Sequence, residues 1–181
     1  MRPTGSSPAA KGSERARRVL WGRSAALALL LCAACGGAQA GGARGPEVRL
    51  RLESLDGGEV DTAAYRGRVV VLHLFDTAAP GAAVDADQLN ALARAEPRRV
   101  MVIGVSLDPE GHRVVGGWRR AVGATYVIAL GGAAVRAGGS PLGAVEVIPT
   151  TVVLDRDGAV RARIGRALSY GELARVVEPL L

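Results

Sequence analysis

Few side chains in this sequence are of the types that carry out nucleophilic, redox or metal chemistry. The 181 residues include two cysteines, Cys32 and Cys35, and two histidines, His73 and His112. The C-x-x-C spacing of the cysteines is one that dithiol redox sites and zinc sites use. Both cysteines, however, directly follow the apolar run 24–31 near the N-terminus. We therefore expect neither chemistry from them.

The two histidines do not predict a metal site. His73 lies inside the apolar run 69–75, where a neutral, hydrogen-bonded imidazole is the expected state. His112 lies near the start of an expected helix, where we expect it to be solvated. No third ligand type stands near either histidine at metal spacing. The sequence therefore predicts no metal and no cofactor.

The N-terminal segment has the pattern of an export signal. The apolar run 24–31 follows Arg15, Arg17, Arg18 and Arg23 and is shorter than a membrane-spanning helix requires. Arg17-Arg18 leaves a twin-arginine signal open as a variant of this interpretation. We therefore expect residues 1–35 to be a signal peptide of the lipoprotein type and not part of the fold.

Two processing routes remain open at the end of this signal. Residues 31–36 resemble a lipobox, which predicts a lipid on Cys35 and a membrane-anchored protein. Ala38-Gln39-Ala40 matches an ordinary signal peptidase site, which predicts cleavage after Ala40. We favour lipidation of Cys35. Either route leaves the mature chain without a free thiol.

The positive charge of the sequence is concentrated in the same segment. The net charge is +6, and residues 1–35 hold five Arg, one Lys and one Glu. The remaining 17 Arg are nearly balanced by 16 acidic residues. No basic stripe alternates with aromatic residues, so we predict no nucleic-acid partner.

The elements that would position a site follow from hydrophobic periodicity. Residues 69–75 predict a strand buried on both faces, residues 85–95 a helix, and residues 100–108 a second buried strand. A crossover of this length makes the two strands parallel. The pattern is that of an α/β domain with a central sheet.

The flanking segments complete this α/β pattern. Residues 36–47 predict a flexible tether, and residues 48–60 a hairpin around Asp56-Gly57-Gly58. A helix is expected from Pro109-Glu110 to about Val122, although Gly116-Gly117 weakens it. A short strand over 126–129, a helical turn over 133–137 and a hairpin over 152–164 follow. Ser169 and Glu172 have the spacing of a capping box for a final helix.

The stretch 69–82 resembles the extracytoplasmic thioredoxin-like proteins of the TlpA and ResA kind, the redoxin-type thiol-disulfide oxidoreductases. That family typically has V-V-L-N-F-W-A-T-W-C-P-P-C followed by a helix with a leucine at the position of Leu89. Val70, Val71, Leu72, Thr77 and Pro80 match, and His73 replaces the asparagine. The resemblance runs from Val48 to Leu181 and implies a thioredoxin-like fold with a central mixed sheet flanked by helices and an N-terminal β-hairpin extension. Residues 48–181 would form this domain.

In this alignment the family's two cysteines fall on Ala79 and Ala82. Thiol-disulfide exchange needs a thiolate to attack and a second thiol to resolve the mixed disulfide, so no catalytic residue is assigned. Ile148-Pro149-Thr150 resembles the family's V-P-T segment, whose proline is cis and lies against the redox motif. The resemblance implies a partner-binding groove lined by Asp76, Thr77, Ala79, Pro80, Gly81, Ala82, Ile148, Pro149 and Thr150.

Asp76 replaces the family's alanine, and three roles remain open for it. It could be exposed without a role, cap the following segment, or bind a cationic group of a partner. Trp118 is expected to be a packed aromatic residue.

Three functions compete at this stage. The first is a non-catalytic protein-binding module or accessory of the cell envelope, with an exported or membrane protein as its partner. The second, implied by family resemblance alone, is a thiol-disulfide oxidoreductase acting in disulfide reduction or cytochrome and oxidase maturation. The third is a structural accessory whose groove is empty. We expect the protein to be exported to the periplasm or cell envelope. We favour a non-catalytic role over an enzymatic one.

Overall fold

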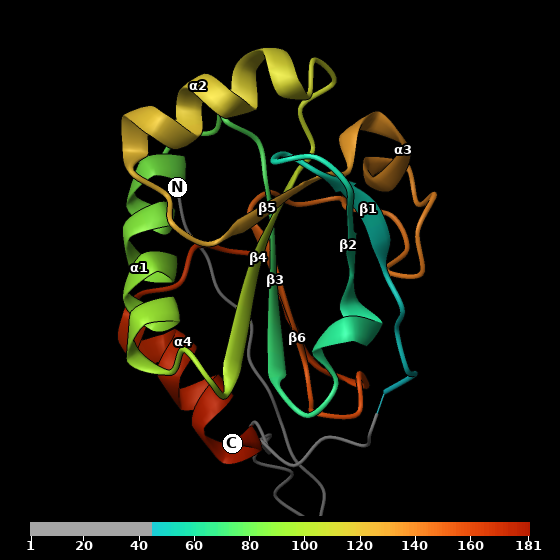
Figure 1. The fold of residues 1–181 in the computed structure, drawn as a ribbon, viewed down its shortest axis with the longest axis vertical. Helices are drawn as coiled ribbons and strands as arrows, with labels where there is room; N and C mark the ends of the chain where they lie inside the picture. The colour runs from blue at the N-terminus through green and yellow to red at the C-terminus, as the bar shows by residue number, and fades with distance from the viewer. Residues whose placement is uncertain (1–44) are drawn as a thin grey trace, which may run out of the picture. The chain divides into compact units, whose positions relative to one another are not determined.

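The computed structural model describes residues 45–181, which build a seven-stranded mixed sheet with helices on both faces (Figure 1). The strand order is β2-β1-β5-β4-β3-β6-β7. The strands are β1 (Arg51–Ser54), β2 (Glu59–Asp61), β3 (Val69–Phe75), β4 (Val100–Ser106), β5 (Val127–Leu130), β6 (Thr150–Leu154) and β7 (Val160–Ile164). The helices are α1 (Ala82–Ala95), α2 (His112–Val122), α3 (Gly132–Arg136) and α4 (Tyr170–Val177), with short 3-10 turns at Thr62–Tyr65 and Glu178–Leu180.

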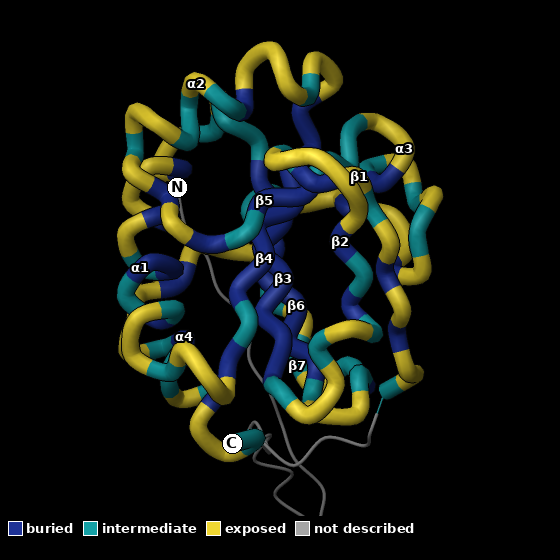
Figure 2. Tube along the Cα trace, viewed as in Figure 1, coloured by how far each residue is buried: buried dark blue, intermediate teal, exposed yellow. Residues whose placement is uncertain are grey.

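Strand β3 is apolar along its whole length because both of its faces are covered. Val70, Leu72 and Leu74 belong to one hydrophobic cluster, and Val69, Val71 and Phe75 belong to the other. All seven residues of the strand are buried (Figure 2). Alternation of side chains along a strand thus divides one continuous apolar run between two cores.

Different elements cover the two faces of the sheet. Helices α1, α2 and α4 contribute to the cluster that contains Phe75, through Leu89, Leu92, Val115, Leu173 and Val177. Helix α3 and the segment before β6 contribute to the opposite cluster, through Val135, Leu142 and Val145. The arrangement confirms the expected thioredoxin-like architecture, including the N-terminal hairpin.

The sheet is mixed, as expected. β3 pairs with β4 in parallel, from Val69 opposite Val100 to Phe75 opposite Ser106. β3 also pairs with β6, antiparallel, with Leu74 opposite Thr150. The ends of β3 and β4 and the beginning of β6 therefore meet at one edge of the sheet.

Helix boundaries differ from the sequence expectation where tertiary contacts intervene. α1 begins three residues earlier than predicted, directly after Gly81, whose φ of 90° is a left-handed conformation that favours glycine. α2 is continuous through Gly116-Gly117, because Val115 is buried and Trp118 packs on Phe75 with ring centroids 4.7 Å apart. α4 has the predicted capping box.

The chain joins the sheet at the end opposite to the β3–α1 loop. The Gly45 N–H donates to the Val160 carbonyl at 3.1 Å, and the Val48 N–H donates to the Gly158 carbonyl at 2.9 Å. Residues 45–47 of the expected tether therefore lie beside residues 158–160, where β7 begins. The expected signal, Cys35 and the rest of the tether lie outside the described residues. No helix within residues 45–181 combines the length and apolar character needed to span a membrane.

Candidate functional site

The residues expected to form the groove gather at the edge of the sheet where β3 ends and β6 begins. Residues 76–81 form the loop from β3 to α1. The pairing of Leu74 with Thr150 places the preceding Ile148-Pro149 segment at the same edge. The Ile148–Pro149 peptide bond is cis, as expected from the resemblance.

These residues differ in exposure. Pro80 and Gly81 are exposed, whereas Ala82 and Thr150 are buried. The other five are partly buried: Asp76, Thr77, Ala79, Ile148 and Pro149. A ligand at this edge would therefore reach the side of Ala79 and Pro80, with Ala82 beneath the surface.

Asp76 is held within the domain by two interactions. One carboxylate oxygen accepts a hydrogen bond from the Ala78 N–H at 3.0 Å, and the other lies 2.7 Å from Nη2 of Arg136. The first contact is the capping role considered above. The cationic partner of Asp76 is therefore Arg136 of this chain, on α3. The sequence analysis did not single out Arg136.

A second carboxylate, Asp108, fastens the loop after β3 to the end of β4. Its side chain accepts hydrogen bonds from the Thr77 N–H at 3.2 Å, the Thr77 hydroxyl at 2.6 Å and the Ser106 hydroxyl at 2.7 Å. Asp108 is buried. Buried carboxylates are stabilised by several donors, so this network fixes the backbone just ahead of Ala79. Sequence reasoning missed Asp108.

His73 and Asp85 form a buried pair beneath the beginning of α1. His73 Nε2 lies 3.7 Å from the Asp85 carboxylate and has no hydrogen bond to any residue of 45–181, while Nδ1 lies 3.2 Å from the Thr151 hydroxyl. Burial lowers the pKa of His73 to about 4 and raises the pKa of Asp85. The expectation of a neutral, hydrogen-bonded His73 is confirmed.

The segment before Pro149 borders a hollow of about 350 Å³ lined by Ala144, Glu146, Val147, Thr150, Arg163 and Gly165. Arg163 donates to the carbonyls of Leu142 and Ala144 and so positions this segment from β7. Val147 is 51% exposed. The N–H and C=O of Ile148 have no hydrogen-bond partner within residues 45–181. An apolar side chain and free main-chain groups thus stand side by side at the expected groove.

The remaining expectations concern His112, Trp118 and metal ligands. His112 is exposed and contacts Glu53 at 2.9 Å. Trp118 packs on Phe75, as expected for a packed aromatic residue. Within residues 45–181, no three His, Cys, Asp or Glu side chains are grouped so that they could hold a metal ion.

The family model for redoxin matches residues 40–171, which span most of the chain. A comparison with curated proteins finds no match for this sequence.

Several solved structures share the fold. A DsbF homologue from Corynebacterium diphtheriae is 24% identical with a TM-score of 0.66, over 76% of this chain and 87% of that one. A thiol:disulfide interchange protein from Chlorobium tepidum is 20% identical with a TM-score of 0.65, over 77% and 97% of the two chains. A secreted thiol-disulfide isomerase from Corynebacterium glutamicum is 21% identical with a TM-score of 0.66, over 74% and 84%. At these sequence identities the similarity establishes a shared fold alone.

Proposed function

Because the chain belongs to the redoxin family, and its sequence has alanine at positions 79 and 82, we propose that it is an exported thioredoxin-fold protein that binds a partner without redox chemistry. Both cysteines of the sequence precede residue 36, so the domain has no thiol with which to attack a disulfide. The ligand would be an extended segment of an exported or membrane protein.

The observation that carries this proposal is the unpaired backbone of Ile148 beside exposed Val147. An extended segment can add its own N–H and C=O groups to such a backbone, as peptides do at sheet edges. Val84, on the first turn of α1, is a further exposed large apolar residue, and it follows the loop 76–81 closely in the sequence. Apolar side chains of the segment would contact Val147 and the adjacent hollow.

Export is part of the proposal. The arginines followed by the apolar run 24–31 support it, as does the description of a structural neighbour as secreted. Attachment of a lipid to Cys35 would keep the domain at the cell envelope. Retention in the membrane fraction of wild type, together with release of a Cys35→Ser variant, tests this anchoring.

The groove is tested with a photoreactive amino acid placed at position 147 of the full chain in its native host. We expect one exported protein to be crosslinked, and this product to disappear when Ala79→Trp is added. Ala79 is a better position to fill than Ala82, because Ala82 is buried. Position 114 on α2 is the matched control, since Val114 is also exposed and apolar. Equal products from positions 147 and 114 would reject the groove as a binding site.

The competing function is a thiol-disulfide oxidoreductase, which family membership favours. It predicts insulin reduction above the buffer control by the exported protein. We expect no such activity, because neither alanine offers a sulfur atom.

A further inference from the structure

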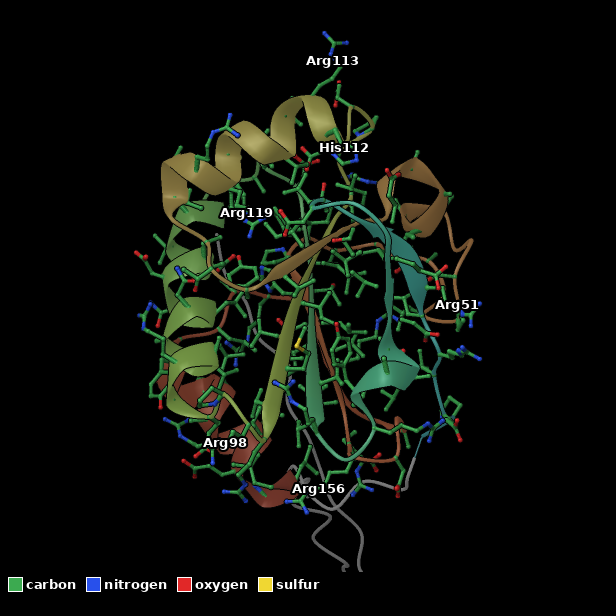
Figure 3. The ribbon with its side chains drawn as sticks, viewed as in Figure 1. Arg51, Arg98, His112, Arg113, Arg119 and Arg156 are labelled. Atoms are coloured by element: carbon green, nitrogen blue, oxygen red, sulfur yellow. The ribbon has the colours of Figure 1, made fainter. Side chains whose placement is uncertain are left out.

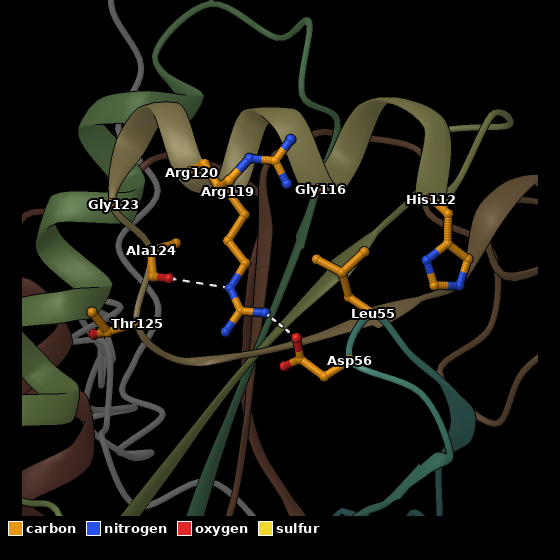
Figure 4. Close-up of a pocket in the computed structure, with 9 residues that line it drawn as sticks. All are labelled: Leu55, Asp56, His112, Gly116, Arg119, Arg120, Gly123, Ala124 and Thr125. Atoms are coloured by element: carbon orange, nitrogen blue, oxygen red, sulfur yellow. Dashed lines mark hydrogen bonds and ion pairs between the residues drawn. The ribbon is translucent and has the colours of Figure 1, made fainter.

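A second hollow, of about 450 Å³, lies beside α2 and shares no residue with the groove (Figure 4). Its walls are α2, the turn after β1 and the segment before β5, contributing Leu55, Asp56, His112, Gly116, Arg119, Arg120, Gly123, Ala124 and Thr125. Two arginines therefore face a pocket whose walls include a single carboxylate. This excess of positive charge favours an anionic occupant.

Arg119 extends from α2 across this pocket, and two of its nitrogens are already bound (Figure 4). Nη1 donates to Asp56 at 2.5 Å, and Nε donates to the Ala124 carbonyl at 3.4 Å. These contacts fix the plane of the guanidinium and leave Nη2 without a partner among residues 45–181. A guanidinium held in this way loses little conformational freedom when it binds a ligand.

Arg120 provides a second donor group. It makes no hydrogen bond or ion pair with any residue of the described chain, 45–181. Its Nη1 lies 3.8 Å from the position that a Cβ on Gly116 would occupy. Arg120 therefore lies at the pocket wall with its full hydrogen-bonding capacity free, whereas Arg113, near the start of the same helix, points away from the molecule (Figure 3).

Gly116 keeps this wall open. Glycine in the interior of a helix is unfavourable, yet the backbone of Gly116 is helical and a Cβ there would make only an ordinary contact with Arg120. The fold therefore does not require glycine at this position. The physical effect of its missing side chain is to leave the pocket unfilled.

The contact between Arg119 and Asp56 does little for stability by itself. The Asp56 side chain is 63% exposed, and ion pairs in such surroundings contribute little because water screens them. Its clearer consequence is the fixed position of Arg119 across the pocket.

We propose that this pocket binds a small oxyanion, the carboxylate or phosphate group of a small molecule, with Nη2 of Arg119 and the guanidinium of Arg120 as the donors in its walls. Arginine is suited to both groups because its N–H donors match their oxygens and carry the opposite charge. Leu55 and Ala124 would contact an apolar part of the ligand. This site is independent of the proposed groove.

The test titrates the ¹⁵N-labelled protein, expressed as the full chain and purified after its natural processing, with sodium phosphate or sodium succinate. Sodium chloride keeps the ionic strength constant. We expect saturable shifts of the amide signals of Gly116, Gly123 and Thr125 with at least one of the two anions. The anion with the higher affinity, phosphate or succinate, shows whether the site prefers a phosphate or a carboxylate group. Absence of saturation with both overturns the proposal.

Four variants separate a specific site from general attraction of anions. Arg120→Gln should weaken binding about tenfold, since it removes a charged donor. Gly116→Leu should abolish binding while raising helix stability, so that lost binding is not explained by unfolding. Asp56→Asn, which keeps an acceptor for Arg119 and removes the competing charge, should tighten binding about threefold. Arg113→Gln is the control and should leave the affinity unchanged.

Equal weakening by Arg113→Gln and Arg120→Gln would show that the anion responds to the overall charge of α2, and would overturn the proposal. So would unchanged affinity in Gly116→Leu, because a ligand inside the pocket cannot coexist with the added side chain.

Discussion

Two carboxylates near the β3–α1 loop, Asp108 and Asp85, are equally buried but differ in their surroundings. Asp108 accepts hydrogen bonds from Thr77 and Ser106. Asp85 faces His73 across 3.7 Å, and the nearest nitrogen of that histidine donates no hydrogen bond. The first is a satisfied network that fixes the loop. The second is a buried pair whose neutral forms are favoured by desolvation.

The contrast shows that different residues determine the conformation of the β3–α1 loop and the binding of protons at this edge of the sheet. The loop geometry depends on Asp108 and does not require a thiol at position 79 or 82. Burial shifts the pKa values of both His73 and Asp85, so this pair responds to pH. The Asp108 network and the His73–Asp85 pair can each be tested by substitutions that leave the other unchanged.

The largest expected effect is a gain of activity. If the Asp108 network maintains a loop suitable for redox chemistry, the double variant Ala79→Cys/Ala82→Cys should reduce insulin at least about tenfold faster than the buffer control, because the first thiol would lie just ahead of the N-terminus of α1. The single variant Ala79→Cys is the control, since it has no resolving thiol. An inactive but folded double variant would show that the loop has lost more than its sulfur atoms.

Replacement of Asp108 should have the largest effect on stability. Asp108→Ala leaves the Thr77 N–H and the Ser106 hydroxyl without their acceptor, which should lower the free energy of unfolding by about 3 kcal/mol. Denaturant unfolding measures the change. Asp87→Ala is the matched control because Asp87 is an exposed carboxylate on α1. Equal losses in the two variants would contradict the role given to the network.

The buried pair predicts a distinct response to acid. The pKa of His73 is about 4 in the folded protein and 6.5 as its reference value, so between these pH values the unfolded chain binds a proton that the folded one does not. The free energy of unfolding should therefore fall as pH falls from 6.5 to 4, by up to about 3 kcal/mol from His73. The raised pKa of Asp85 acts in the opposite direction and offsets part of this loss.

Urea unfolding at a series of pH values tests this response. His73→Asn should flatten the decline between pH 6.5 and 4, whereas His112→Asn, which changes an exposed histidine, should leave it in place. A decline of the same steepness in His73→Asn would assign the acid sensitivity to other groups.

The smallest expected effect concerns Asp76 and Arg136, which are both partly exposed. Arg136→Gln should lower the free energy of unfolding by about 0.5 kcal/mol, because solvent screens the ion pair. The same variant should leave crosslinking from position 147 unchanged if Asp76 acts only within the domain. Loss of the crosslinked product would give this ion pair a part in partner binding.

The sequence was sufficient to predict the parts of the fold that depend on strong periodicity. The buried strands β3 and β4, their parallel pairing and the capping box of α4 all followed from local patterns. The sequence predicts a helix weakened at Gly116-Gly117, whereas the observed continuity of α2 depends on Val115 and Trp118 packing against the sheet. Tertiary contacts there outweigh helix propensity.

The two carboxylate contacts at the site differ in how far the sequence could have revealed them. Thr77 follows the first of two predicted parallel strands, and Asp108 is the last residue of the second. The ends of such strands meet at the same edge of a sheet, so their contact could have been inferred. Arg136 lies in a glycine-rich connection without a strong pattern. Its contact with Asp76 depends on the path of residues 131–148 and had no sequence signal.

The attachment of the chain at Gly45–Val48 determines the end of the domain at which a tether would enter. This segment lies against β7 and the turn at Gly158, at the end of the sheet where β3 begins, while the loop bearing Ala79 lies where β3 ends. The seven residues of β3 separate the two ends by about 23 Å. A lipid on Cys35, as proposed, would hold the domain by the end remote from Val147 and Pro80. The groove would then lie at the end of the domain remote from the tether, open to partners that approach through the surrounding solution.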